Sequence, residues 1–157
     1  MTIVRPVRQW EIGELVRLGR LFHAEAALGG NFDATGLAEF LHNMRKLGNL
    51  VAFVAEKDDR TITGCIVGIR SKQMMTDVIL LEELYWYVEP EHRGGTAGFR
   101  LLDAFVKHSK TGPCGGVVMA RLSAGHDNLH RYYTRQGFSE IETHYLRLWQ
   151  SPQPLSQ

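Results

Sequence analysis

A glycine-rich segment at residues 92–100 lies between an apolar stretch and an amphipathic helix pattern. Gly94, Gly95 and Gly98 have no side chain to keep a ligand away, so their N–H groups can approach it closely. A helix that begins here presents unpaired N–H groups and the positive end of its dipole to an anion. The segment contains Arg93 but no acidic residue, so a bound phosphate would supply the missing negative charge. This pattern predicts a phosphate site; the alternative is that Gly94 and Gly95 only form a turn.

Two common phosphate loops fit this segment poorly. A Walker loop requires Gly-Lys-Ser/Thr, and no lysine follows these glycines. A dinucleotide fingerprint requires GxGxxG after the first strand of a βαβ unit, and the spacing of Gly94, Gly95 and Gly98 differs from it. We therefore predict neither of these two nucleotide sites.

Two neighbouring carboxylates, Glu82 and Glu83, lie inside the otherwise apolar strand pattern 79–88. Buried carboxylates are costly unless they are paired or used in chemistry. Because side chains alternate along a strand, Glu82 shares a face with Trp86, and Glu83 shares the opposite face with Tyr85, unless a bulge intervenes. Either carboxylate is a candidate general base, and the alternative for both is a solvated charge or an ion pair.

Hydrophobic periodicity predicts the elements that position these groups. Helices are predicted at 9–27, 35–47, 97–109 and 127–136. Strands are predicted at 3–7, 50–56, 61–70, 79–88, 116–122 and 138–149. The order β-α-α-β-β-β-α-β-α-β predicts an α/β fold, a single domain with a mixed central sheet, and not the strict βαβ alternation of a doubly wound fold.

Length, charge and cysteine content limit the kind of protein that this chain can be. The chain has 157 residues, and we expect one domain at 1–150 followed by a disordered tail at 151–157. Lys plus Arg total 18 and Asp plus Glu total 17, which leaves a net charge of +1 and argues against a nucleic-acid binder. Only Cys65 and Cys114 are present, so we expect a reduced, cytoplasmic protein. Neither a signal peptide nor a membrane-spanning run is evident.

The residues around the glycines resemble the GNAT superfamily of acyl-CoA-dependent N-acetyltransferases. The signature of that family is Arg/Gln-x-x-Gly-x-Gly/Ala after a strand that ends in Val-x-Pro. Val88, Pro90, Arg93 and Gly98 match it, with Thr96 where the middle glycine is usual. The run ELYWYVEPEHRGG looks most like short members from bacteria and phages.

A second motif extends the resemblance toward the C-terminus. Tyr133, Gly137 and Phe138 match the family's Tyr-x-x-x-Gly-Phe. The predicted order of elements is also similar to that of the family, so the resemblance covers residues 2–149. It implies a GNAT fold.

The resemblance implies acetyl-CoA as the cosubstrate. Backbone amides near Tyr87 and Val88 would orient the acetyl carbonyl and the pantetheine. The residues implied at the pyrophosphate are Arg93, Gly94, Gly95, Thr96, Ala97 and Gly98. An asparagine that contacts the cofactor in the family lies seven residues before the tyrosine. Here that place is held by His126, with Asn128 two residues later, and both stay candidates.

The resemblance also implies catalytic roles. Tyr133 would be the general acid, because a phenol with a pKa of ~10 is protonated at neutral pH and can protonate a departing thiolate. The alternative is a core tyrosine beside Tyr132. Glu82 stands six residues before Val88, a spacing similar to that of the base in histone-type members. Glu83, or water, is the alternative base.

The predicted function is direct transfer of an acetyl group from acetyl-CoA to an amine of a small molecule or protein. One alternative is a tRNA-acetylating toxin of the same fold, against which the net charge of +1 argues. Another is a non-catalytic CoA-binding module, which Thr96 and His126 leave open. His126 and His130 are four residues apart, but no third ligand is evident, so we predict no metal site. The family often dimerises, and the sequence does not decide for or against a homodimer.

Overall fold

The computed structural model describes residues 1–122 and 127–149. Its strands are β1 (Thr2–Pro6), β2 (Leu50–Lys57), β3 (Ile62–Lys72), β4 (Ile79–Val88) and β5 (Gly116–Val118). Its helices are α1 (Ile12–Ala26), α2 (Ala34–Lys46), α3 (Ala97–Lys110) and α4 (Asp127–Arg135), with short 3₁₀ turns η1 (Gln9–Glu11) and η2 (Pro90–His92) before α1 and α3. Among these residues, no helix is long and apolar enough to cross a membrane. The tail predicted at 151–157 lies outside the described residues.

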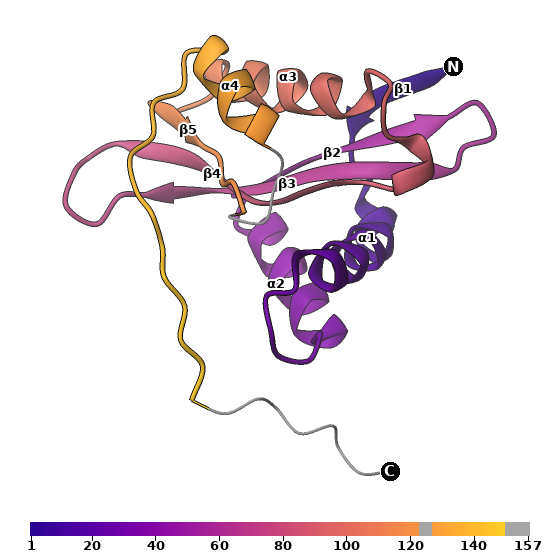
Figure 1. Cartoon of the computed structure of the whole chain (residues 1–157), viewed down its shortest axis with the longest axis horizontal. Helices are drawn as coiled ribbons and strands as arrows, with labels where there is room; N and C mark the ends of the chain where they lie inside the picture. The colour runs from indigo at the N-terminus through magenta and orange to yellow at the C-terminus, as the bar shows by residue number, and fades with distance from the viewer. Residues whose placement is uncertain (123–126, 150–157) are drawn as a thin grey trace.

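The five strands form one sheet in the order β1-β2-β3-β4-β5. The first four strands are antiparallel neighbours, and β5 runs parallel to β4. Helices α1 and α2 cover one face of the sheet, and α3 and α4 lie on the other face (Figure 1). Each face has its own buried cluster, one around Leu15 and Leu41 and one around Leu101 and Phe105. The predicted α/β fold with a mixed central sheet is confirmed.

Helix boundaries follow from local sequence. In α1, Ile12, Leu15 and Leu18 recur at helical spacing and are buried against the sheet, as an amphipathic helix requires. The start of α2 is capped by Asp33, whose carboxylate accepts a hydrogen bond of 2.9 Å from the Gly36 N–H. Helix α2 therefore begins and ends within one residue of the predicted range, whereas α1 begins three residues later than predicted because Gln9–Glu11 form η1.

Strand β5 is shorter than the predicted strand at 116–122. It pairs with β4 only through Leu80–Glu82, which face Gly116–Val118 in a parallel register. Beyond Glu82 the two strands separate, and residues 119–122 then lack a neighbouring strand with which to form a ladder. The separation exposes one edge of β4 between Glu83 and Val88, which positions the candidate site.

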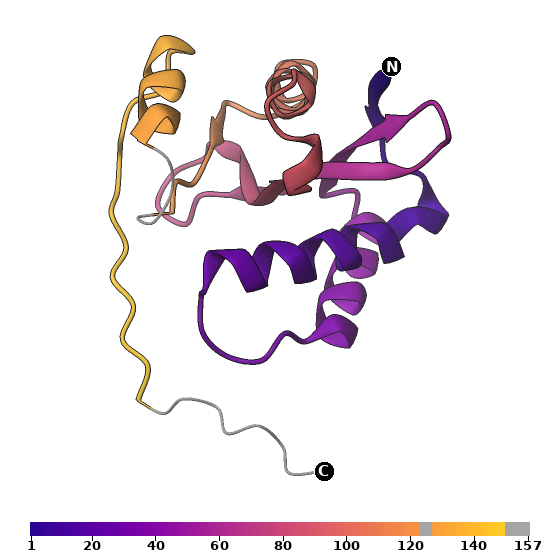
Figure 2. The same ribbon diagram turned by 45° about the vertical axis from the view of Figure 1, so that its right-hand side comes forward.

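The strand predicted at 138–149 does not form, and this prediction is wrong. The described residues of this segment carry no strand assignment, and the side chains from Ser139 to Trp149 are exposed. Strand propensity forms a strand only where a neighbouring sheet edge offers hydrogen-bonding partners. The segment leaves α4 and runs past the sheet toward the side of α1 and α2, so it does not lie along an edge (Figure 2).

Candidate functional site

The start of α3 has unpaired backbone donors. Thr96 is the N-cap residue, and its side chain makes no capping hydrogen bond. The first turn contains no acidic residue, and the first N–H that bonds within the helix is that of Arg100, to the Thr96 carbonyl. Among the described residues, the N–H groups of Ala97, Gly98 and Phe99 therefore have no backbone acceptor, and they present a positive dipole end.

The glycines before this helix differ in what the fold requires of them. Gly94 has a positive φ of 87°, a conformation that favours glycine. Gly95 has no such φ, and a Cβ atom added to it would meet nothing within 4 Å. At Gly98 an added Cβ would lie 3.5 Å from the Trp86 ring, an ordinary contact. The protein alone thus has no need for glycine at 95 or 98, and the space next to the backbone is open at Gly95.

Arg93 connects the glycine segment to α1 and β4. Its guanidinium donates to both carboxylate oxygens of Glu25, at 2.8 and 2.7 Å, and its Nε donates to the Val88 carbonyl at 2.7 Å. The same guanidinium lies 5.1 Å from the centre of the Tyr87 ring. In this structure Arg93 therefore fixes the loop against the end of β4.

The edge of β4 continues beyond its pairing with β5. Tyr87 and Val88 pair with Cys65 and Gly64 of β3 on one side, whereas pairing on the β5 side ends at Glu82. Tyr87 is buried in the cluster under α1, and Val88 packs against the cluster under α3. This edge leads from the separation of β4 and β5 toward the start of α3, a path suited to an extended ligand.

Two predicted catalytic residues meet at the separation of β4 and β5. One carboxylate oxygen of Glu83 accepts a hydrogen bond of 3.0 Å from the Ala120 N–H. The Tyr133 hydroxyl of α4 donates to the Ala120 carbonyl at 3.1 Å. Burial raises the pKa of the Glu83 carboxyl to about 7, although the Ala120 hydrogen bond opposes this. Burial also raises the pKa of the Tyr133 phenol, and the nearby charge of Glu83 adds to that effect.

Glu82 lies apart from this pair. Its carboxylate accepts a hydrogen bond from the Ser71 hydroxyl on β3. The strand register shifts between Val67 and Gly68, so Glu83 faces Gly68 and Tyr85 faces Val67. This bulge breaks the simple alternation, and Glu83 does not share a face with Tyr85 as the uninterrupted pattern would require.

The bulge is also visible in the packing of the strand. Leu81 is buried in the cluster under α3, and Trp86 packs against the same cluster although it lies five residues later. Two residues an odd number of positions apart face the same side only where the alternation is interrupted. The interruption lies between Glu83 and Tyr85, so Glu83 shares the face of Leu81 and not that of Tyr85.

Two further residues were predicted to contact the cofactor, and the structure describes one of them. His126 lies outside the described residues. Asn128 is exposed in the first turn of α4, the helix that carries Tyr133. Sequence reasoning did not find Ala120 or Glu25. Ala120 acts through its backbone, which carries no sequence signal, and Glu25 is an ordinary helix-surface carboxylate until the fold places it beside Arg93.

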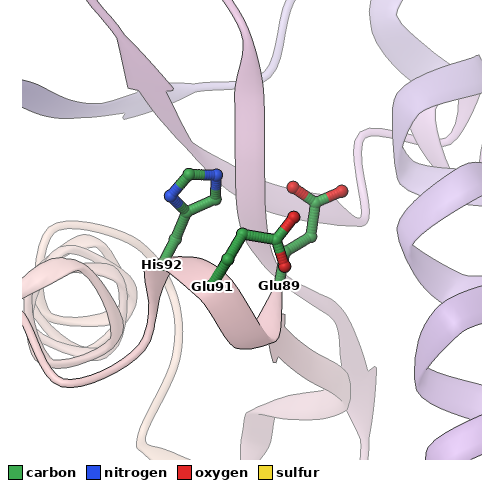
Figure 3. A group of neighbouring side chains, drawn as sticks. All are labelled: Glu89, Glu91 and His92. Atoms are coloured by element: carbon green, nitrogen blue, oxygen red, sulfur yellow. The ribbon is translucent and has the colours of Figure 1, made fainter.

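Three side chains after β4 could be taken for a metal site. Glu89, Glu91 and His92 each place one ligand atom within 4.8 Å of the others (Figure 3). Glu89 already accepts a hydrogen bond from the Arg17 guanidinium, which offsets its charge. Exposed acidic groups of this kind are common without an ion, and we do not assign a metal to them.

Similarity to known proteins comes from a family model and from solved structures. The family model described as an acetyltransferase (GNAT) domain matches residues 48–140. No curated protein matches the chain.

Solved structures give the same fold. A predicted acetyltransferase with acetyl-CoA from Clostridium acetobutylicum has a TM-score of 0.78 at 20% identity, covering 94% of this chain and 96% of that one. The glucosamine-6-phosphate N-acetyltransferase from Arabidopsis thaliana has a TM-score of 0.69 at 15% identity, covering 96% and 99%. The ribosomal-protein-alanine N-acetyltransferase from Brucella melitensis biovar Abortus 2308 has a TM-score of 0.67 at 16% identity, covering 94% and 99%.

Proposed function

Because the chain belongs to the GNAT acetyltransferase family, we propose that it transfers an acetyl group from acetyl-CoA to an amine acceptor. The observation that carries this proposal is the start of α3. Its N–H groups lack an acidic cap, and Gly95 leaves open space beside the backbone that the fold itself does not require. A pyrophosphate in that space would accept hydrogen bonds from the backbone of residues 93–98 and meet the positive end of the helix dipole.

The rest of the cofactor follows the free edge of β4. The pantetheine would pair with backbone groups near Tyr87 and Val88, which have no strand partner on the β5 side. This path brings the thioester toward the separation of β4 and β5, where Glu83 and Tyr133 lie on either side of Ala120. His126 and Asn128 remain candidates for contacts to the cofactor from the α4 side. Acetyl-CoA would supply the activated acetyl group.

The proposed transfer requires one proton to leave the amine and one to reach the thiolate. Glu83 takes a proton from the acceptor, since a carboxyl with a pKa of about 7 is a useful base at neutral pH. The neutral amine attacks the thioester carbonyl, and the tetrahedral intermediate collapses with loss of the CoA thiolate. Tyr133 donates its phenolic proton to that sulfur.

Glu83 is the preferred base over Glu82 on geometric grounds. Glu83 shares the Ala120 bridge with Tyr133, so the base and the acid are held in one place. The Glu82 carboxylate instead accepts a hydrogen bond from the Ser71 hydroxyl. The proposed acceptor is an amine.

The test measures CoA binding by calorimetry in the wild type and in a Gly95→Glu variant. A carboxylate in the open space at Gly95 would fill the pyrophosphate position and repel its charge. Two charges about 4 Å apart repel by roughly 1–4 kcal/mol, so this repulsion alone should lower CoA affinity by about 5- to 900-fold.

The matched control is Gly13→Glu. Gly13 is exposed near the start of α1, and an added Cβ there would also meet nothing within 4 Å. This variant should bind CoA like the wild type, and both variants should melt near the wild-type temperature. Wild-type CoA affinity in the Gly95→Glu variant would overturn the placement of the pyrophosphate. CoA binding without acetyl transfer across a panel of amines would instead indicate a binding module.

A further inference from the structure

A cavity opens at the edge of the sheet where β1 leaves β2. The last pair of this ladder is Pro6 opposite Phe53, after which the Val7 N–H donates to the Ala52 carbonyl at 3.0 Å. Among the described strands, the first two residues of β2 then have no partner on this side, although β3 pairs with them on the other. The cavity at this point has a volume of about 190 Å³, and its walls come from the chain after β1, the end of α2, the start of β2 and the end of α3.

The side chains that line this cavity are of two chemical kinds. Arg45, in the last turn of α2, and His108, in the last turn of α3, supply hydrogen-bonding nitrogen atoms. The apolar part of the wall includes Leu50, Val51 and Phe53, of which the last two are buried in the cluster under α3. None of the described residues that line the cavity is acidic. A complementary ligand therefore combines one anionic group with an apolar body.

The Arg45 guanidinium has only weak partners within the protein. It donates to the Arg8 carbonyl at 3.4 Å and to the Val7 carbonyl at 3.3 Å, both longer than the usual range of about 2.7–3.2 Å. A cation at a helix C-terminus favours the helix dipole, but the exposed neighbour Lys46 already supplies one. Arg45 instead lines the cavity, where an anion would accept stronger hydrogen bonds from it than these two carbonyls do.

The hydrogen-bonding state of His108 is set by Arg70 on β3. The Arg70 Nη2 lies 2.8 Å from the His108 Nε2, and a guanidinium can only donate, so the imidazole accepts at Nε2 and carries its proton on Nδ1. Burial and the charge of Arg70 both lower the pKa of His108, in agreement with a neutral ring. The Nδ1–H has no acceptor among the described residues, so it is available to a ligand.

Arg70 adds a positive charge next to His108 that the protein does not neutralise. Its Nη1 donates to the Gly48 carbonyl at 2.9 Å, and its Nε is buried without a hydrogen-bond partner. In the described part of the chain Arg70 forms no ion pair, and Asp103, the one acidic residue of α3, pairs with Lys107. A buried cation with an unsatisfied donor is costly, and a bound anion nearby lowers that cost.

We propose that this cavity binds a small carboxylate with an apolar body, of the class of aromatic monocarboxylates. The carboxylate accepts hydrogen bonds from the Arg45 guanidinium and the His108 Nδ1–H, and the apolar body packs against Val51 and Phe53. The cavity has the volume of about six water molecules in the liquid, which suits a compact molecule and not a peptide strand. The site lies at the end of α3, about 20 Å from the start of that helix, so it is independent of the proposed acetyl transfer.

The first test is a titration of the full-length protein with benzoate, followed by NMR at constant ionic strength. Saturable shifts should appear in the backbone amides of Val51, Ala52 and Phe53 and in the ring of His108, with a Kd in about the millimolar range for so small a ligand. Benzamide has the same shape without the charge. It should bind at least about fivefold more weakly, which is the least that a unit charge about 4 Å away contributes.

The second test repeats the benzoate titration on variants of the end of α2. Arg45→Gln removes the charge and keeps an N–H donor, so benzoate affinity should fall at least about fivefold. Lys46→Gln is the matched control, because it removes the same charge from the adjacent exposed residue, and it should bind benzoate like the wild type. Arg45→Lys restores the charge and should recover most of the affinity.

The comparison of benzoate with benzamide uses the wild type alone, so it decides the proposal even if Arg45→Gln does not fold. Wild-type shifts that do not saturate, equal affinity for benzoate and benzamide, or an equal loss in Lys46→Gln and Arg45→Gln would each overturn the proposal. Shifts centred on residues 93–98 would also overturn it, because they would place benzoate at the start of α3 and not in this cavity.

Discussion

At the scale of single residues, Glu83 should control the rate in acidic solution. Burial raises the pKa of its carboxyl to about 7, and a general base acts only when it is deprotonated. Turnover should therefore rise as the pH rises toward 7 and should fall about tenfold for each pH unit below it. Glu83→Gln should remove this acidic limb and lower kcat by ~10²–10⁴-fold. The measurement is kcat/KM and kcat between about pH 5.5 and 9.

The neighbouring Glu82→Gln substitution is the matched control for Glu83. Glu82 bonds to Ser71 and is not connected to the Tyr133 bridge, so this variant should keep the wild-type acidic limb. If the Glu83→Gln enzyme also keeps that limb, the amine loses its proton to water or to another residue.

The Tyr133 hydroxyl should affect turnover more than cofactor binding. Burial and the nearby charge of Glu83 raise the pKa of the phenol, so it is protonated at neutral pH, which is the form that a proton donor requires. Tyr133→Phe should lower kcat by ~10²–10⁴-fold and change CoA affinity by only a few-fold. Tyr132→Phe, on the same helix, is the comparison and should retain activity. An unchanged kcat in the Tyr133→Phe enzyme would assign this residue to packing.

Residue types in the sequence predicted part of this site. The glycine segment and the two carboxylates could be found because each departs from what a structural helix start or an apolar strand requires. The choice between Glu82 and Glu83 could not be made, because it depends on a one-residue register shift opposite β3. The backbone hydrogen bonds of Ala120 to Glu83 and Tyr133 could not be predicted either, because nearly every residue has the same backbone donor and acceptor.

At the scale of elements, an ion network fixes β1 to β2 and to the start of α1. The Arg5 guanidinium donates to both oxygens of Glu11, at 2.8 and 2.7 Å, and its Nε donates to Glu56 at 2.8 Å. Both carboxylate residues are buried. Arg5→Leu would leave the two buried carboxylates with Arg8 alone, whose N–H donates to Glu11 at 2.7 Å and whose guanidinium lies 3.5 Å from Glu11 and 3.9 Å from Glu56. Loss of the main partner of a buried charge typically costs about 3–5 kcal/mol. Urea unfolding should show a loss of this size in the free energy of unfolding.

Lys107→Leu is the control for this network. Lys107 pairs with Asp103 at 2.8 Å on the outer face of α3, and both side chains are more than half exposed. A surface pair of this kind contributes about 0–1 kcal/mol, so the variant should unfold close to the wild type. Equal losses in the two variants would indicate that the Arg5 network does not stabilise the fold beyond an ordinary surface pair.

Elements that bury an apolar face within one chain were predicted well. The predicted strand at 79–88 agrees with β4, and α3 begins at the predicted residue. The predictions at 116–122 and 138–149 are too long or wrong because strand formation depends on a partner edge, which local sequence does not supply. Helices need no such partner for their backbone hydrogen bonds, so their periodicity is a more direct signal.

At the scale of the whole molecule, β4 joins the two halves of the structure. Its residues alternate between the cluster under α1 and α2, which includes Tyr85 and Tyr87, and the cluster under α3, which includes Leu81. The proposed cofactor path runs along this same strand and ends at the start of α3. A ligand bound there would therefore stabilise both layers of helices, and not only the loop that holds its phosphates.

Acetyl-CoA should accordingly stabilise the whole domain in one unfolding transition. A ligand at 100 times its Kd adds about 2.7 kcal/mol, which for a domain of this size raises Tm by roughly 5–10 °C. Hydrogen exchange should slow in the core amides of α1 as well as in those of α3, because both helices pack on β4. The Gly95→Glu protein should show neither effect at the same acetyl-CoA concentration, whereas Gly13→Glu should show both. Slower exchange confined to α3 and its preceding loop would contradict the coupling through β4, even if the cofactor binds where we place it.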